Sequence, residues 1–143
     1  MSDALERLRS LTDRISSFEL ARTQNLKDLK KLYDSFSIDN EAVNFDNIFN
    51  FSAMNLAGIS LQEETLGEIK DKKYVQIIVI ESAKGGQKAK NINLAYFGRS
   101  DKLDANKKSE IVEFVLRWRF EKSFRSMQHY HDMINLNKKS SHG

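Results

Sequence analysis

The chain has 143 residues, with 23 Lys and Arg against 20 Asp and Glu, and it contains neither cysteine nor proline. The absence of cysteine excludes disulfides, thiolate metal sites and cysteine nucleophiles, and the absence of proline excludes proline-rich linkers and docking peptides. Because no apolar run approaches the roughly 18 residues of a membrane span and the N-terminus lacks the apolar core of a secretory signal, we expect a soluble intracellular protein, cytoplasmic, or nuclear in a eukaryote, with no membrane partner.

The first predicted element is a long amphipathic helix over residues 1–40. Apolar residues recur every three or four positions from Leu5 to Phe36, and a heptad frame leaves only Arg22 and Asn25 as polar residues on the seam. Such a seam needs a helical partner, which is either a second copy of the chain or another long helix of the same chain. We favour a coiled-coil-like homodimer through Leu8, Leu11, Ile15, Phe18, Leu29, Leu32 and Phe36.

The two polar seam residues have two interpretations. Polar residues at seam positions lower the stability of a coiled coil but fix its register. Alternatively, Arg22 and Asn25 mark a solvated bend, and Leu20, Ala21 and Leu26 take over the seam locally.

After residue 40 the apolar residues alternate with polar ones, which is typical of strands. The pattern predicts a half-buried strand over 43–51 with a bulge at 47–48, a second strand or bent continuation over 54–61, and a strand over 73–82 that is apolar on both faces and therefore covered on both. A strand over 91–98 returns after the loop 83–90, where Gly85 and Gly86 supply the positive φ of a turn. We expect an antiparallel meander of three to four strands.

The last predicted element is a long helix from Asp104 to residue 136, with Asp104 or Asp101 as its N-cap. It is apolar on nearly all sides over 111–120, so we expect it to pack on the sheet, with Trp118 buried against the strand 75–80. Beyond this segment the apolar residues narrow to a stripe that is a candidate surface for a protein partner: Phe120, Phe124, Met127 and His131, continued by Ile134. Residues 137–143 are predicted to be a disordered tail.

The predicted fold class is therefore α+β, with an N-terminal helix (1–40), a small α+β domain (41–136) and the tail (137–143). No catalytic, cofactor or metal motif is present. His129 and His131 are two residues apart, so on a helix their rings point away from each other and cannot share one ion. The Gly85–Gly86 loop lacks the spacing of a phosphate-binding loop, and Glu63, Glu64 and Glu68 lack the apolar surroundings that would raise a carboxyl pKa.

These observations favour a non-enzymatic protein–protein interaction module that needs no cofactor and acts as an adaptor, assembly factor or inhibitor. Nucleic-acid binding is the alternative, through the basic hairpin loop 84–90 and the segment 99–108. Tyr96 and Phe97 are adjacent on a strand, so one of them faces away from the core and can stack on a base. The candidate contact residues are Lys84, Lys88, Lys90, Arg99 and Lys102.

Overall fold

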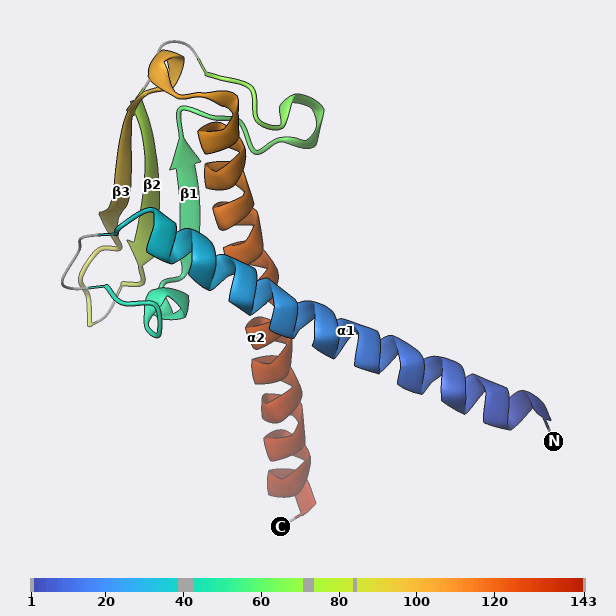
Figure 1. The fold of residues 1–143 in the computed structure, drawn as a ribbon. Coiled ribbons are helices and arrows are strands. Elements are labelled where there is room, and N and C mark those ends of the chain that lie inside the picture. The colour runs from blue at the N-terminus through green and yellow to red at the C-terminus, as the bar shows by residue number, and fades with distance from the viewer. Residues whose placement is uncertain (1, 39–42, 71–73, 84, 143) are drawn as a thin grey trace.

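The computed structural model describes residues 2–38, 43–70, 74–83 and 85–142. The predicted α+β class is confirmed: an N-terminal helix, a three-stranded antiparallel sheet and a long C-terminal helix (Figure 1). Short 3₁₀ helices (η) lie between them. In chain order the elements are α1 (Ser2–Ser35), η1 (Ile48–Asn50), β1 (Ala53–Ala57), η2 (Glu63–Thr65), β2 (Tyr74–Glu81), β3 (Lys90–Arg99), η3 (Ser100–Lys102) and α2 (Ala105–His142).

The sheet has the order β1-β2-β3, with both neighbouring pairs antiparallel. Val75, Ile77 and Val79 of β2 are fully buried beneath the helices, whereas the alternate residues point to the other face. The prediction that this strand is covered on both faces is wrong, because both helices pack on one side of the sheet and leave the other side open (Figure 1). Gly85 and Gly86 have the positive φ values predicted for the turn between β2 and β3.

Residues 43–51 form a turn and η1 instead of the predicted strand. Asn44 and Asn47 explain the difference, because the backbone N–H of each residue donates to the side-chain oxygen of the other at 2.9 Å. Local bonds of this kind compete with the ladder of a sheet. The segment still buries three apolar residues, Val43, Ile48 and Phe49.

Helix α2 supplies much of the core through Ile111, Phe114, Val115 and Trp118. Asp104 caps it by accepting a 2.7 Å hydrogen bond from the backbone N–H of Lys107. Trp118 is buried as predicted, but its indole N–H donates to the Ile48 carbonyl at 2.9 Å and its ring stacks on Phe49, so its polar and aromatic partners come from η1.

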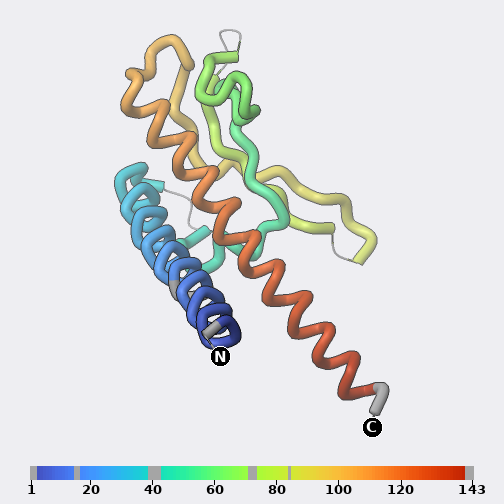
Figure 2. The backbone as a smooth tube through the Cα atoms, turned by 90° about the vertical axis from the view of Figure 1, so that its right-hand side faces the viewer, coloured from blue at the N-terminus to red at the C-terminus, as the bar shows by residue number. Residues whose placement is uncertain are grey.

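Helix α2 does not end at residue 136 but continues to His142, through most of the segment predicted to be a disordered tail. Neither glycine nor proline occurs between Asp104 and Gly143, so nothing in the backbone chemistry of this segment stops the helix. The two long helices cross near their middles and then diverge (Figures 1 and 2). No helix within the described ranges is long and apolar enough to cross a membrane.

Candidate protein-interaction surface

The helix crossing is held by a buried carboxylate. The side chain of Glu121 on α2 has no exposed surface. Arg22 of α1 donates to both of its oxygens, from Nε to Oε1 at 2.8 Å and from Nη2 to Oε2 at 2.9 Å. Arg125, one turn further along α2, donates from Nε to Oε2 at 2.8 Å. Two guanidinium groups therefore neutralise one buried carboxylate, which is the arrangement that makes a buried charge tolerable.

The ionisation of Glu121 follows from this arrangement. Burial alone raises the pKa of the carboxyl group, but the hydrogen bonds and charges of Arg22 and Arg125 outweigh burial, so the pKa lies below its ordinary value. The hydrogen bond to Glu121 in turn raises the pKa of Arg22. Glu121 is thus a permanent anion at neutral pH, suited to an ion pair and unsuited to donating a proton.

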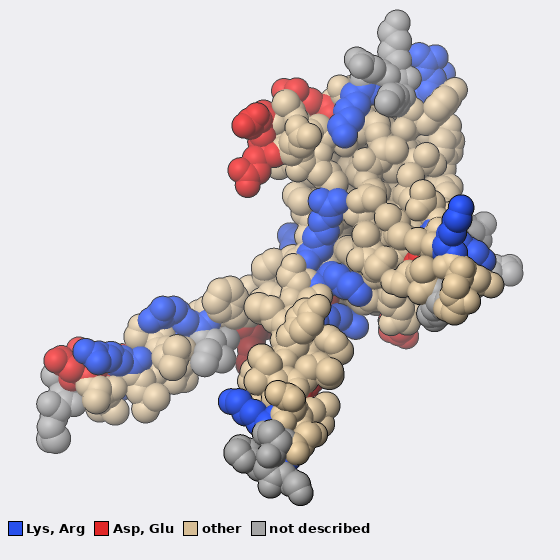
Figure 3. Space-filling model, turned by 180° about the vertical axis from the view of Figure 1, so that it is seen from behind, with Lys and Arg blue, Asp and Glu red and all other residues tan. Residues whose placement is uncertain are grey.

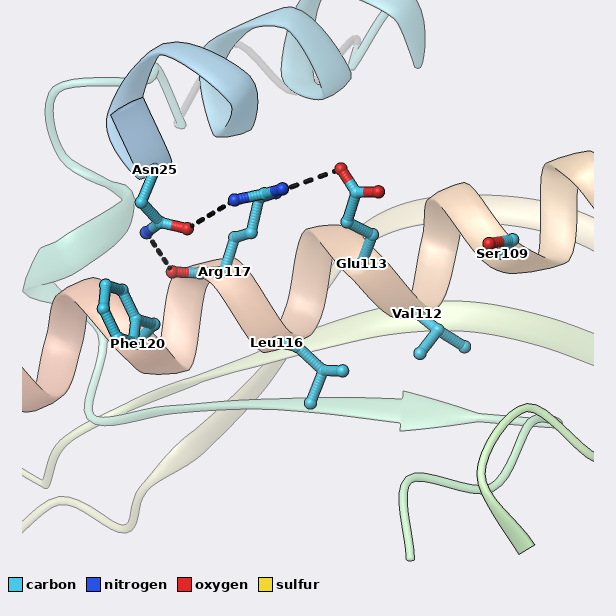
Figure 4. Close-up of a pocket in the computed structure, with 7 residues that line it drawn as sticks. All are labelled: Asn25, Ser109, Val112, Glu113, Leu116, Arg117 and Phe120. Carbon is cyan, nitrogen blue, oxygen red and sulfur yellow. Dashed lines mark hydrogen bonds and ion pairs between the residues drawn. The ribbon is translucent and has the colours of Figure 1, made fainter. Parts of the chain in front are cut away.

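Asn25 forms the second polar contact of the crossing and is itself buried. Its Nδ2 donates to the backbone carbonyl of Arg117 at 3.0 Å, and its Oδ1 accepts from Nη1 of the same arginine at 3.0 Å. Arg117 also donates to Glu113 at 3.0 Å (Figure 4). Helix α1 is continuous through residues 22–25, so the two polar seam residues do not mark a bend; they fix α1 against α2 of the same chain.

A shallow groove of about 370 Å³ lies beside this crossing. In Figure 4 the polar groups of Asn25, Arg117 and Glu113 lie toward α1, and Val112 and Leu116 point to the opposite side of α2. Leu116 and Phe120 both remain partly exposed. The groove is lined by Asn25, Ser109, Val112, Glu113, Leu116, Arg117 and Phe120.

The predicted partner stripe of α2 continues from this groove toward the C-terminus. Phe120, Met127 and His131 are exposed, while Phe124 is half-buried because Phe18 packs edge-on against its ring at 6.1 Å between centroids. Residues spaced by three and four lie on one face of a helix, so Ile134, also exposed, extends the same stripe. We call residues 126–142 the α2 arm.

The predicted seam of α1 falls into two environments. Leu29 has no exposed surface, and Leu32 and Phe36 pack against the same core, so the C-terminal part of the seam is covered within the chain. Leu8, with 60% of its surface exposed, Leu11 and Phe18 are open to solvent. The side chain of Ile15 lies outside the described residues. We call residues 2–20, which project beyond the crossing, the α1 arm.

The apolar stripe of the α1 arm meets the partner stripe of α2 at the contact between Phe18 and Phe124, just before the α2 arm begins. Leu8 and Leu11 lie on the same side of α1 as Phe18, and Met127 lies on the same side of α2 as Phe124. Since the arms diverge beyond this contact (Figure 1), neither covers the stripe of the other. We call the space between the two diverging arms the wedge (Figure 1).

The predicted nucleic-acid residues do not form one cluster. Lys88 and Lys90 lie at the start of β3, and Arg99 and Lys102 lie at its end. A strand of 10 residues is roughly 30 Å long, at about 3.3 Å per residue, so the two pairs are far apart. Lys84 lies outside the described residues. Figure 3 likewise shows the basic side chains in separate groups on one side of the molecule, with acidic ones gathered on the protruding segment around η2.

The wider basic segment 99–108 is partly committed to contacts within the fold. Arg99 forms an ion pair with Asp101 at 3.1 Å. The ammonium group of Lys107 lies 4.8 Å from the ring centroid of Phe36, on the helical side of the sheet. Of the two adjacent aromatic residues, Tyr96 points outward, whereas Phe97 packs inward on Phe36.

Sequence reasoning did not identify Glu121 as the partner of Arg22, although the spacing of apolar residues on α2 points to it. Counted from Ile111 and Phe114 through Trp118, steps of three and four lead to Glu121, which places an acid on the buried face of α2. A buried acid needs a basic partner, and Arg22 interrupts the seam of the other long helix.

No side-chain cluster in the described ranges, among groups of three or more His, Asp or Glu, is placed to hold a metal ion. His129 packs against Tyr130. Comparison of the chain with protein-family models, with curated proteins and with solved structures gives no match in any of the three.

Proposed function

We propose that the chain is a non-enzymatic protein–protein interaction module that pairs with a second copy through its two helical arms and serves as an adaptor, assembly factor or inhibitor. The observation that carries the proposal is the uncovered apolar stripe on each arm. Leu8, Leu11 and Phe18 on one arm, and Met127 and Ile134 on the other, expose half of their surface or more. Soluble monomers rarely expose contiguous apolar patches of this kind.

The stability of the arms supports the same proposal. A helix in a protein derives most of its stability from the packing of its apolar face, and an isolated helix in water is marginal. Beyond the contact between Phe18 and Phe124, the described side chains of the two arms are exposed and lack such packing within the chain. A helical partner in the wedge would supply it.

Charge favours contact between unlike arms of two copies. On the α1 arm the acids Asp3, Glu6, Asp13 and Glu19 outnumber the bases Arg7, Arg9 and Arg14. On the α2 arm Lys138 and Lys139 outnumber Asp132. An α1 arm laid against the α2 arm of another copy therefore brings opposite net charges together, and two-fold symmetry makes the contact twice.

Sedimentation velocity of matched variants tests the proposal. The wild type should sediment at twice its 16.5 kDa monomer mass. Leu8→Glu combined with Leu11→Glu should give a folded monomer, because a buried carboxylate in an apolar interface is unfavourable. Leu20→Glu is the control, since Leu20 is 71% exposed and lies about 200° around the helix from Phe18.

The control variant should sediment as the wild type does. A wild type that stays monomeric at the highest soluble concentration would refute self-association. A double variant that dimerises as well as the wild type would place the interface outside the α1 arm.

A further inference from the structure

The face of the sheet that the helices leave open carries tyrosine, amide and apolar side chains. Because Val75, Ile77 and Val79 point into the core, Tyr74 and Gln76 point to the open face. The register of β2 with β3 places Arg99 opposite Tyr74, and Tyr96 opposite Gln76. Further along the same face, Asn93 lies opposite Ile78 and Asn91 opposite Ile80.

Two tyrosines dominate one end of this face. Tyr74 is 56% exposed and Tyr96 57% exposed. Their ring centroids are 6.0 Å apart, and the ring planes are inclined by 35°. Each tyrosine therefore supports the other from the side while much of its surface remains open to a planar ligand.

We propose that the open face binds single-stranded nucleic acid, with bases stacked on Tyr74 and Tyr96. Arg99, opposite Tyr74, supplies a cation on this face, the exposed Lys102 follows it in η3, and the exposed Lys88 lies in the loop at the far end of β3. Lys90 pairs with Glu81, two residues along β2 from the core-facing Val79, and is therefore not part of this face. The proposal concerns the side of the sheet opposite the helices and is independent of the self-association of the arms.

The arrangement selects a single strand over other polyanions. An aromatic platform with cations along its path is the general mode by which proteins bind single strands without sequence preference. In a duplex the bases are already stacked on one another, so the tyrosines have no free base to contact. Among the described residues, the acids near these cations include Asp101, which pairs with Arg99 at 3.1 Å, and Asp104, two residues after Lys102. A phosphate would compete with Asp101 for Arg99.

Fluorescence anisotropy with a labelled mixed-sequence oligonucleotide tests the proposal, with single-stranded DNA, single-stranded RNA and duplex DNA as probes at low salt. Tyr74→Ala and Tyr96→Ala should each weaken single-strand binding by about 5- to 150-fold, the range expected when one base no longer stacks. Tyr130→Ala is the matched control, because Tyr130 is an equally exposed tyrosine on the α2 arm. It should bind as the wild type does.

The contribution of the basic side chains is measured separately, from the salt dependence of oligonucleotide binding. Lys88→Glu combined with Lys102→Glu should reduce the dependence of log affinity on log salt by roughly 0.7 for each phosphate that the variant no longer neutralises. The variant Leu8→Glu with Leu11→Glu should bind the oligonucleotide as the wild type does, so failure of the arm interface and failure of this site are distinguishable.

Three results would overturn the proposal. One is the absence of any anisotropy change at low salt, and another is equal affinity of the tyrosine variants and the wild type. The third is duplex binding as tight as single-strand binding, which would indicate general attraction to phosphates. Loss of self-association in the tyrosine variants, without oligonucleotide binding, would assign the open face to a protein partner instead.

Discussion

Glu121 shows how one residue fixes the angle between the two long helices. Its carboxylate has no exposed surface and receives three hydrogen bonds, two from Arg22 on α1 and one from Arg125 on its own helix. A planar guanidinium that binds both oxygens defines orientation as well as distance. The ion pair therefore sets where α1 leaves the fold and where the wedge begins.

The first prediction concerns the stability of the fold in acid. The pKa of Glu121 in the folded chain lies below its ordinary value of 4.5, so its ion pairs stabilise the fold fully above that value. This contribution is lost as the pH falls through the lower, folded-state pKa. Urea unfolding between pH 7 and pH 3 should show a steeper loss of stability for the wild type than for Glu121→Gln.

Glu113→Gln is the matched control for this experiment. Glu113 lies on the same helix and also pairs with an arginine four residues further on, but its side chain is exposed. This variant should follow the pH profile of the wild type. Parallel profiles for the wild type and Glu121→Gln would contradict the assigned role of the buried carboxylate.

The second prediction concerns Trp118. Its ring is buried and its N–H donates to the Ile48 carbonyl, so the native protein should have a blue-shifted tryptophan emission. Trp118→Ala should lower the free energy of unfolding by about 3 to 5 kcal/mol. Trp118→Phe, which keeps an aromatic ring but loses the hydrogen bond, should lower it less. Emission typical of water in the native state would contradict the burial.

At the scale of elements, the sequence is informative wherever periodicity is long and uninterrupted. The strands at residues 74–81 and 90–99 and the start of α2 agree with the predictions, because alternation and a capping aspartate are local signals. The strand prediction over 43–51 is wrong because the backbone N–H groups of Asn44 and Asn47 donate to each other's side-chain oxygens. The alternation of apolar and polar residues in this segment does not reveal these hydrogen bonds.

The candidate surface could be predicted only in part. The stripe on α2 from Phe120 to His131 was identifiable from spacing, and Met127 and His131 are exposed on it. The seam of α1 was identifiable too, but a heptad pattern does not say which helix covers it. That choice depends on contacts about a hundred residues apart in sequence, between Arg22 and Glu121 and between Asn25 and Arg117.

The third prediction separates the two parts of that seam. Leu29→Glu should unfold the protein, because Leu29 has no exposed surface and even truncation of a buried leucine costs about 2 to 5 kcal/mol. Leu8→Glu should leave the midpoint of thermal unfolding of a dilute sample nearly unchanged. Circular dichroism melts of the two variants provide the comparison. A folded Leu29→Glu would mean that this part of α1 is also available to a partner.

At the scale of the whole molecule, two surfaces with different chemistry lie on opposite sides of one small sheet. The helical side ends in two diverging arms with apolar stripes, and the other side is an open sheet face with paired tyrosines and Arg99. The core between them is formed by α2, all three strands, η1 and the C-terminal part of α1. Substitutions on either surface should therefore change one proposed interaction without disturbing the core.

The central claim, that the arms are the interface between copies, is tested most directly by amide hydrogen exchange at two protein concentrations. Protection of residues 2–20 and 126–142 should rise with concentration, because pairing supplies the packing that the arms lack in the single chain. Protection of β2 and of residues 111–118 should not change. The account would be contradicted if the arms exchange at the same rate at both protein concentrations and the protein keeps its monomer mass of 16.5 kDa over that concentration range.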